Sequence, residues 1–322
     1  MKKRLILIIA VIAGLAVVVN ADVTIQRKSV LSSLMGLGGS ESQDNQFIKA
    51  DKSCHDMSTA FTSGMMKKLT GGKASGESQI VRLDRQLVWN LDPQKKTYTE
   101  MTFAAMKEMM KQAMAQMGDS GLKSDDENLY TWTIEMQPAG NNETVNGFDC
   151  KYAAGKAVGV NKRTPADTVI IDYQNWFGQN VAGEKELRQY EENYAAALGL
   201  DKMEIQQGMQ QFLNSYGEQF KKLADNFKDV GGYPIKTIIE VTKIGAAKKV
   251  SETGEQEEKE SQSGIMGKLG GKLGKMMAQK DDKGGGPAKP FSMTTEVLKI
   301  ETSTIDDGKF EIPAGYKKIE KK

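Results

Sequence analysis

The residues that carry most enzymatic and metal chemistry are scarce in this chain of 322 residues. It has one histidine, His55, and two cysteines, Cys54 and Cys150. Without a second histidine, a serine-hydrolase triad would have to be built on His55. No acidic cluster has the spaced oxygen ligands of an EF-hand loop. The scarcity predicts a protein that is not an enzyme and that needs no metal ion and no other cofactor.

Long apolar runs are also scarce, and the one that is present lies at the N-terminus. A basic segment at 2–4 precedes an apolar run at 5–19, and small residues follow up to Ala21. This pattern is typical of a secretory signal peptide cleaved after Ala21. The run is shorter than the ~20 residues that a spanning helix needs. No cysteine follows it closely, which excludes a bacterial lipoprotein, so we expect a signal peptide at 1–21 and a periplasmic or secreted protein.

An excess of charge of one sign is missing. The chain has 44 basic and 42 acidic residues. Removing the basic segment 2–4 leaves 41 basic residues, a net charge of −1. Bulk attraction to nucleic acid needs a clear excess of positive charge. No nucleic-acid partner is therefore predicted.

What is present is a long succession of strand patterns. Alternating or β-branched runs predict strands at 80–83, 87–91, 97–101, 129–136, 148–152, 168–177, 233–244 and 291–305. Apolar residues at steps of three and four predict helices over 103–117, 184–198 and 203–227. Short turns such as Asn146-Gly147 favour antiparallel pairing. The pattern indicates an α+β fold, mainly antiparallel β, with a curved sheet covered on one face by helices.

Two polar segments interrupt this pattern. The Ser- and Gly-punctuated stretch 22–46 predicts a flexible leader, in which Val30, Leu31, Leu34 and Met35 form one short amphipathic helix. The Lys- and Gly-rich stretch 245–290 predicts a flexible insertion. The remainder of 47–322 is long enough to bury the core of a single domain.

The two cysteines form a candidate disulfide, because an exported protein folds in an oxidising compartment. Two free, buried thiols are the alternative, since the sequence does not supply the distance between the two Cα atoms. Cys54 and His55 also suggest a nucleophilic or metal-binding pair. Neighbouring side chains of a strand point to opposite faces, so an enzyme built on this pair is disfavoured.

Methionine is abundant, with 18 residues, several of them on the predicted helix 103–117. Flexible thioethers re-pack around irregular apolar groups, which suits a cavity for a hydrophobic ligand. The candidate residues that line this cavity are Met106, Met110, Met114, Phe212 and Tyr216. Ordinary core packing is the alternative. Copper binding through thioethers is a third interpretation, which burial of the sulfur atoms disfavours.

The predicted insertion contains a basic amphipathic segment. The candidates for contact with a membrane surface or an envelope protein are Ile265, Lys268, Leu269, Lys272, Leu273 and Met276. Glycines between Gly264 and Gly274 oppose helix formation by about 1 kcal/mol each. A segment that stays disordered is therefore the alternative.

Several motifs carry a resemblance to a known family. They are Val81-Arg82-Leu83-Asp84, Leu87-Val88-Trp89-Asn90-Leu91, Asn146-Gly147-Phe148-Asp149-Cys150, Gly232-Tyr233-Pro234 and Phe310-Glu311-Ile312-Pro313. In these the chain resembles a family of uncharacterised exported bacterial proteins with a domain of unknown function. That family is similar in architecture to periplasmic lipoprotein carriers of the LolA and LolB type. The resemblance implies an unclosed half-barrel whose concave face is covered by helices and holds acyl chains.

Together these observations predict a non-enzymatic periplasmic binding protein. Its ligand is expected to be a lipid, an acyl chain or an apolar peptide. The alternative is an envelope interaction or structural protein with no ligand cavity, which contacts a membrane or a partner protein through the insertion at 245–290.

Overall fold

The computed structural model describes residues 21–34, 38–109, 112, 129–137, 140, 142–199, 219, 222–223, 225–227, 230–245 and 288–320. Residues 1–20 of the predicted signal peptide and 246–287 of the predicted insertion lie outside these ranges. The signal peptide and the flexible insertion therefore stay predictions.

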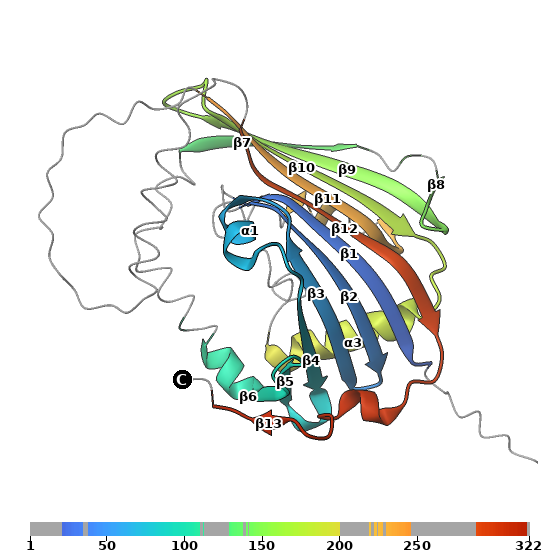
Figure 1. Cartoon of the computed structure of the whole chain (residues 1–322). Coiled ribbons are helices and arrows are strands. Elements are labelled where there is room, and N and C mark those ends of the chain that lie inside the picture. Colours follow the sequence, from blue (N-terminus) through green and yellow to red (C-terminus); the bar gives the residue numbers. More distant parts are fainter. Residues whose placement is uncertain are drawn as a thin grey trace, which may run out of the picture.

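One 13-stranded sheet forms the body of the protein (Figure 1). The first half of the chain supplies β1 (Val23–Leu34), β2 (Ser40–Lys49), β3 (Lys52–Phe61), β4 (Ser75–Arg82), β5 (Leu87–Asp92) and β6 (Thr97–Thr102). The second half supplies β7 (Tyr130–Gln137), β8 (Asn142–Val145), β9 (Phe148–Asn161), β10 (Thr168–Gly178), β11 (Tyr233–Ile244), β12 (Ala288–Thr302) and β13 (Lys317–Lys318).

The strand order is β13-β6-β5-β4-β3-β2-β1-β12-β11-β10-β9-β7, with β8 beside β9. Among the described residues, only the short pairing of β13 with β6 is parallel. The strands at the two ends of this order do not pair with each other, so the sheet is unclosed. The predicted α+β class with a mainly antiparallel, unclosed sheet is confirmed.

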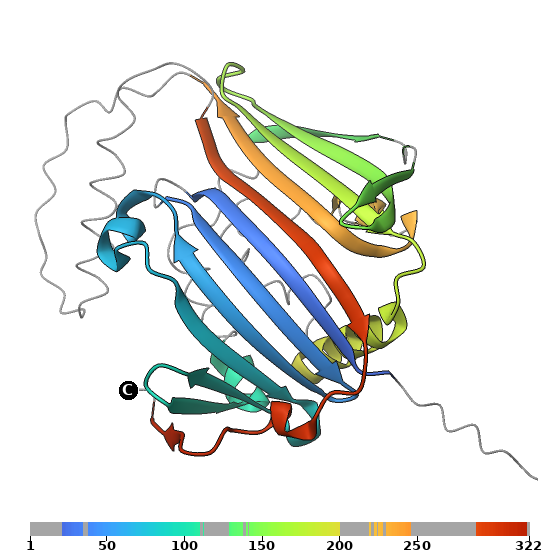
Figure 2. The same ribbon diagram turned by 45° about the vertical axis from the view of Figure 1, so that its right-hand side comes forward.

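The sheet is strongly curved, as both views show (Figures 1 and 2). The pairing register shifts between Gln26 and Arg27 on β1 and between Trp176 and Phe177 on β10. An extra residue on one strand of a pair bends and twists the sheet locally. These irregularities therefore contribute to the curvature.

The helices lie on one side of the sheet or at its ends. They include α1 (Gly64–Thr70) and α3 (Glu184–Leu198), with short 3-10 helices at Leu83–Arg85 and Asp307–Phe310. Residues 103–109 are helical, as are the described residues 219, 222–223 and 225–226. α3 has the bounds that the sequence predicts. In the described part of the chain, no helix has the length and apolar character needed to cross a membrane.

α3 defines the two faces of the sheet. Its Leu187 and Tyr190 pack against Val23 and Ile25 of β1, and its Leu198 belongs to a cluster with buried residues of β4 and β5. We call the face that α3 contacts the inner face, and the opposite one the outer face. Figure 2 shows this yellow helix behind the strands, on the concave side.

The predicted flexible leader at 22–46 is wrong. β1 lies in the middle of the sheet, hydrogen-bonded to β2 on one side and to β12 on the other. Val23 and Ile25 are fully buried, and Val30 and Leu31 belong to β1 rather than to a helix. The polar residues that suggested a leader are strand residues, and the partner that orders β1 lies at the far end of the chain.

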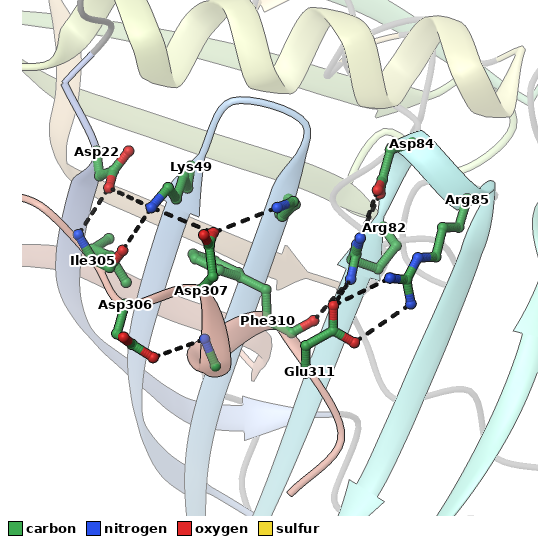
Figure 3. A network of polar contacts seen from close by, with 12 residues as sticks. Asp22, Lys49, Arg82, Asp84, Arg85, Ile305, Asp306, Asp307, Phe310 and Glu311 are labelled. Carbon is green, nitrogen blue, oxygen red and sulfur yellow. Dashed lines mark hydrogen bonds and ion pairs between the residues drawn. The ribbon is translucent and has the colours of Figure 1, made fainter.

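The C-terminal segment 303–316 closes the outer face near the ends of β2 to β5. Phe310 is 0% exposed and packs in a cluster with Cys54, Ile80 and Trp89. A polar network surrounds this contact (Figure 3). Lys49 Nζ lies 3.5 Å from an Asp22 carboxylate oxygen.

Arg82 is the buried centre of the second half of this network. Its guanidinium donates to Asp84 at 2.6 Å and also to Glu311, and Arg85 reaches the same glutamate (Figure 3). These carboxylates raise the pKa of Arg82, and the hydrogen bond that Arg82 donates to Asp84 is the largest cause. The same hydrogen bond lowers the pKa of Asp84. The C-terminal segment is thus fixed by one aromatic anchor and by ion pairs around it.

Truncation of the aromatic anchor tests this description. Phe310→Ala removes a fully buried ring, so we expect the free energy of unfolding to fall by about 3–5 kcal/mol. Ile319→Ala, three residues beyond this segment and 47% exposed, should change it by less than about 0.5 kcal/mol. Urea unfolding of both variants measures the difference. Equal, small effects would show that the segment is not part of the core.

The Asp84–Arg82 pair predicts a pH dependence. Because the pKa of Asp84 is lowered in the folded protein, the pair stabilises the fold above the unfolded value of about 3.9. That stability is lost as the pH falls through the folded pKa. Asp84→Asn should therefore be less stable than wild type at pH 7, and the two should converge below about pH 4 in urea titrations at several pH values. A difference that stays constant with pH would contradict the assignment.

Candidate functional site

The inner face is apolar where β12, β11, β10, β9 and β7 lie side by side. Its fully buried members are Ala157, Val169, Ile171, Ile239, Val241 and Phe291. Large apolar side chains that are only partly buried pack against them, namely Leu31, Tyr130, Trp132, Ile134, Met136, Tyr173 and Met293. The inner face thus carries aromatic and aliphatic side chains that are not completely covered.

The outer face of the same strands carries charged side chains among its apolar ones. Cross-strand ion pairs join Lys156 to Asp172 at 3.3 Å and Lys236 to Glu296 at 2.8 Å. Successive side chains of a strand alternate between faces, so each strand contributes to both surfaces. The sheet is amphipathic here, and its apolar side is the concave one.

A second helical segment lies against this apolar zone. The ring of Phe227 lies 5.3 Å from that of Tyr173, centroid to centroid. Leu223 is fully buried and packs on Gly155 so closely that a Cβ there would lie 2.8 Å from Leu223 Cδ2. The inner face is therefore approached by α3 near β1 to β5 and by the segment around Leu223 near β9 and β10.

A polar network lies on the inner face between these two helical segments. Arg27 Nη2 donates to the Tyr233 hydroxyl at 2.8 Å, and that hydroxyl lies 3.3 Å from Glu191 of α3. Arg27 Nη1 contacts Gln46 and lies 3.5 Å from Asp44. His55 Nδ1 lies 3.3 Å from the same aspartate. The guanidinium of β1 thus contacts side chains of β2 and β11 directly, and these in turn contact His55 of β3 and Glu191 of α3.

The electrostatics of this network are internally balanced. Burial acts to lower the pKa of Arg27, but Tyr233 and Asp44 outweigh it, so the pKa is raised and the group stays charged. Burial raises the pKa of Tyr233, which stays neutral and can relay the contact to Glu191. Because two carboxylates already face the guanidinium, the network is not an open anion site. Its clearest effect is to attach α3 to the sheet.

The methionine prediction is only partly covered by the described residues. Met106 is 8% exposed and packs with Phe103, Val81 and Leu198, which is ordinary core packing at the contact between helix and sheet. The other cavity candidates, Met110, Met114, Phe212 and Tyr216, lie outside the described residues. The same holds for the predicted contact residues Ile265, Lys268, Leu269, Lys272, Leu273 and Met276.

The predicted disulfide is wrong. Cys54 and Cys150 are both free and buried, on β3 and β9. These strands are separated by six steps in the strand order, each of about 4.8 Å, whereas bridged cysteines have Cα atoms roughly 5.5 Å apart. An oxidising compartment favours the pairing of two cysteines, but the topology places Cys54 and Cys150 in different packing clusters.

Cys54 and His55 lie on opposite faces of β3, as the alternation predicts. Cys54 packs on the outer face with Ile80 and Phe310, whereas His55 points to Asp44 on the inner face. Burial is the largest cause that raises the pKa of Cys54 to about 11. The thiol is therefore protonated at neutral pH and is a weak nucleophile.

A cavity of about 180 Å³ lies on the outer face under the C-terminal segment. Cys54, Asp56 and Lys309 contribute to its wall, together with Tyr316. Asp56 is already paired, at 2.6 Å with the Ser78 hydroxyl and at 2.5 Å with Lys309. In the described part of the chain, no three His, Cys, Asp or Glu side chains are grouped as metal ligands.

The Arg27 network was missed at the level of the sequence. Its members come from residues 27, 44, 55, 191 and 233 and share no local motif. A signal was present, however, since Arg27 continues the inner-face alternation of Val23 and Ile25. A charged residue at an inward position of a strand indicates a buried polar contact.

Comparisons with known proteins show a distant likeness to a solved structure. No protein-family model matches the chain, and no curated protein matches it. One similar solved structure is the crystal structure of a "putative outer membrane lipoprotein-sorting protein domain" from Vibrio parahaemolyticus, with 9% sequence identity over 90% of this chain and 89% of that chain. Its TM-score is 0.22. At that level the likeness carries no argument about function, and the family resemblance stays a prediction.

Thiol labelling tests the correction on the cysteines. We expect neither thiol to react with iodoacetamide in the native protein, because both are buried. Both should react after unfolding in guanidinium without a reductant. Mass spectrometry counts the added groups. An unfolded chain that takes up no label until a reductant is added would instead demonstrate a disulfide.

Proposed function

We propose that this chain is a non-enzymatic binding protein for a hydrophobic ligand, a lipid or an acyl chain, held against the inner face of the sheet. The observation that carries the proposal is the row of partly buried apolar side chains on the concave face of an amphipathic sheet. An apolar surface that the protein does not completely cover commonly marks a place of binding. The predicted signal peptide sets the expected place of action in the periplasm or outside the cell.

The energetics are adequate for such a ligand. Transfer of a methylene group from water contributes about 0.8 kcal/mol, so ten methylenes contribute roughly 8 kcal/mol before the cost of association. The net affinity expected for one acyl chain is therefore at best about micromolar. The alternative of membrane contact through the insertion concerns residues outside the described ranges and stays a prediction.

Two neighbouring substitutions on β1 test the proposal. Leu31 faces the apolar inner zone, and Val30, the preceding residue, faces outward; both are partly buried. Leu31→Asn places an amide among the apolar side chains, so we expect the affinity for a fluorescent fatty acid to fall about tenfold. Val30→Asn should leave it within twofold. Fluorescence titration of the purified proteins gives both affinities.

Two results would contradict the proposal. One is wild-type protein that shows no saturable uptake of the fatty acid and carries no lipid in native mass spectrometry. The other is an equal loss of affinity in both variants, which would assign the effect to the stability of β1 rather than to the inner face. Thermal unfolding of both variants is measured in parallel.

A further inference from the structure

A row of polar side chains crosses the inner face at the border of its apolar zone. Directly paired positions on six neighbouring strands, from β10 to β3, all carry a hydroxyl or an amide. We call this the polar row, and its members are Asn175, Thr237, Thr295, Ser29, Ser42 and Thr59. Valine has nearly the same shape as threonine and would fill the threonine positions equally well. Packing alone therefore does not explain the hydroxyls.

The polar row is followed at once by apolar residues. On the four strands β1, β12, β11 and β10, the residues two positions away from the row, and so on the same face, are Leu31, Met293, Ile239 and Tyr173. Two residues of a strand span about 6.7 Å. An apolar chain lying on the second row would thus place a polar end group against the first.

Within the polar row, two side-chain hydrogen bonds are formed, and one fully buried donor has no partner among the described residues. Ser29 Oγ lies 3.2 Å from Thr295 Oγ1, and Thr237 Oγ1 donates to Asn175 Oδ1 at 2.8 Å. Asn175 is only 2% exposed, yet its Nδ2 has no hydrogen-bond partner among the described residues. Rotating the amide would only exchange which of its two polar atoms is unpaired.

Among the described residues, the Tyr173 hydroxyl is a polar group near the Asn175 amide. Burial raises the pKa of Tyr173, and the hydrogen-bonding interaction with the Asn175 amide acts to lower it, yet Nδ2 has no partner at hydrogen-bond distance and angle. A buried amide hydrogen without an acceptor destabilises the ligand-free fold. Among the described residues, the other buried side-chain atom without a partner is Gln219 Oε1, four residues before Leu223, which packs on the sheet.

We infer that the polar row is a subsite for the acyl carbonyl of the ligand, whose oxygen accepts a hydrogen bond from Asn175 Nδ2 while the hydrocarbon chain lies on the apolar row. The inference rests on the proposed function and specifies its ligand. Arg27, two residues from Ser29 on the same face, is already balanced by Asp44 and Glu191. The subsite therefore does not require a negative charge, and a carboxylate and an ester share the chemistry that it recognises.

The test compares ligands with and without an acyl carbonyl. N-phenyl-1-naphthylamine, an apolar fluorescent probe, is titrated directly and then displaced by dodecanoic acid and by methyl dodecanoate. Asn175→Leu removes the amide at nearly constant volume. We expect it to weaken both acyl ligands about tenfold, the equivalent of about 1.4 kcal/mol, and to leave the affinity for the carbonyl-free probe within twofold.

Gln174→Leu is the matched control, because Gln174 is the preceding residue and faces outward. It should leave all three affinities unchanged. If the wild type binds the acid and the ester equally, the carbonyl of an ester is sufficient for recognition. If it prefers the acid, the ligand that the subsite recognises is a free fatty acid. Either result is compatible with the subsite.

The failures of the two proposals are distinguishable. Wild-type protein that binds neither the probe nor the acyl ligands overturns the proposed function. Binding of all three with no selective loss in Asn175→Leu overturns only the subsite. Thermal unfolding gives an independent readout: without ligand, Asn175→Leu should melt close to wild type, since the variant loses the hydrogen bond from Thr237 Oγ1 but also loses the buried amide nitrogen that has no partner. A clearly lower melting temperature would assign Asn175 a structural role and overturn the inference.

Discussion

Strand β1 pairs with β12 from Val23 to Leu34, and this ladder joins the two halves of the sheet. On one side of it lie β2 to β6, which follow each other in sequence, and on the other lie β11, β10, β9 and β7. Without the ladder, the two groups would have no shared backbone hydrogen bonds. Because β1 is near one end of the chain and β12 near the other, the sheet is complete only when nearly the whole chain has been made.

The same ladder places the polar and apolar rows of the inner face in register. Ser29 lies opposite Thr295, and Leu31 lies opposite Met293. A slip by one residue would turn every inward side chain of β1 to the outer face. The register shift between Gln26 and Arg27 changes the pairing of the N-terminal part of β1 with β12 and leaves these two pairs intact. The inner surface is therefore a property of the whole sheet, not of one strand.

The sequence predicts elements whose signals are local and misses those whose signals are not. α3 and the turn at Asn146-Gly147 were predicted because their periodicity and backbone preference lie within a few residues; Asn146 and Gly147 have φ angles of 52° and 84°. β1 was missed because polar residues occupy its middle and its partners are distant in sequence. The cysteine pairing failed for the same reason, since only the strand order shows that β3 and β9 lie apart.

The two polar features of the inner face differ in how well their hydrogen bonds are satisfied, and this separates their roles. Around Arg27 the donors meet acceptors on β2, β11 and α3, and the charges are balanced. Such a network orients a helix but has little left for a ligand. Asn175, which is more deeply buried than Arg27, keeps one amide atom unpaired. A buried group that lowers stability calls for an explanation outside the ligand-free fold. Under the proposed function, the polar row rather than the Arg27 network is therefore the place where a ligand would be recognised.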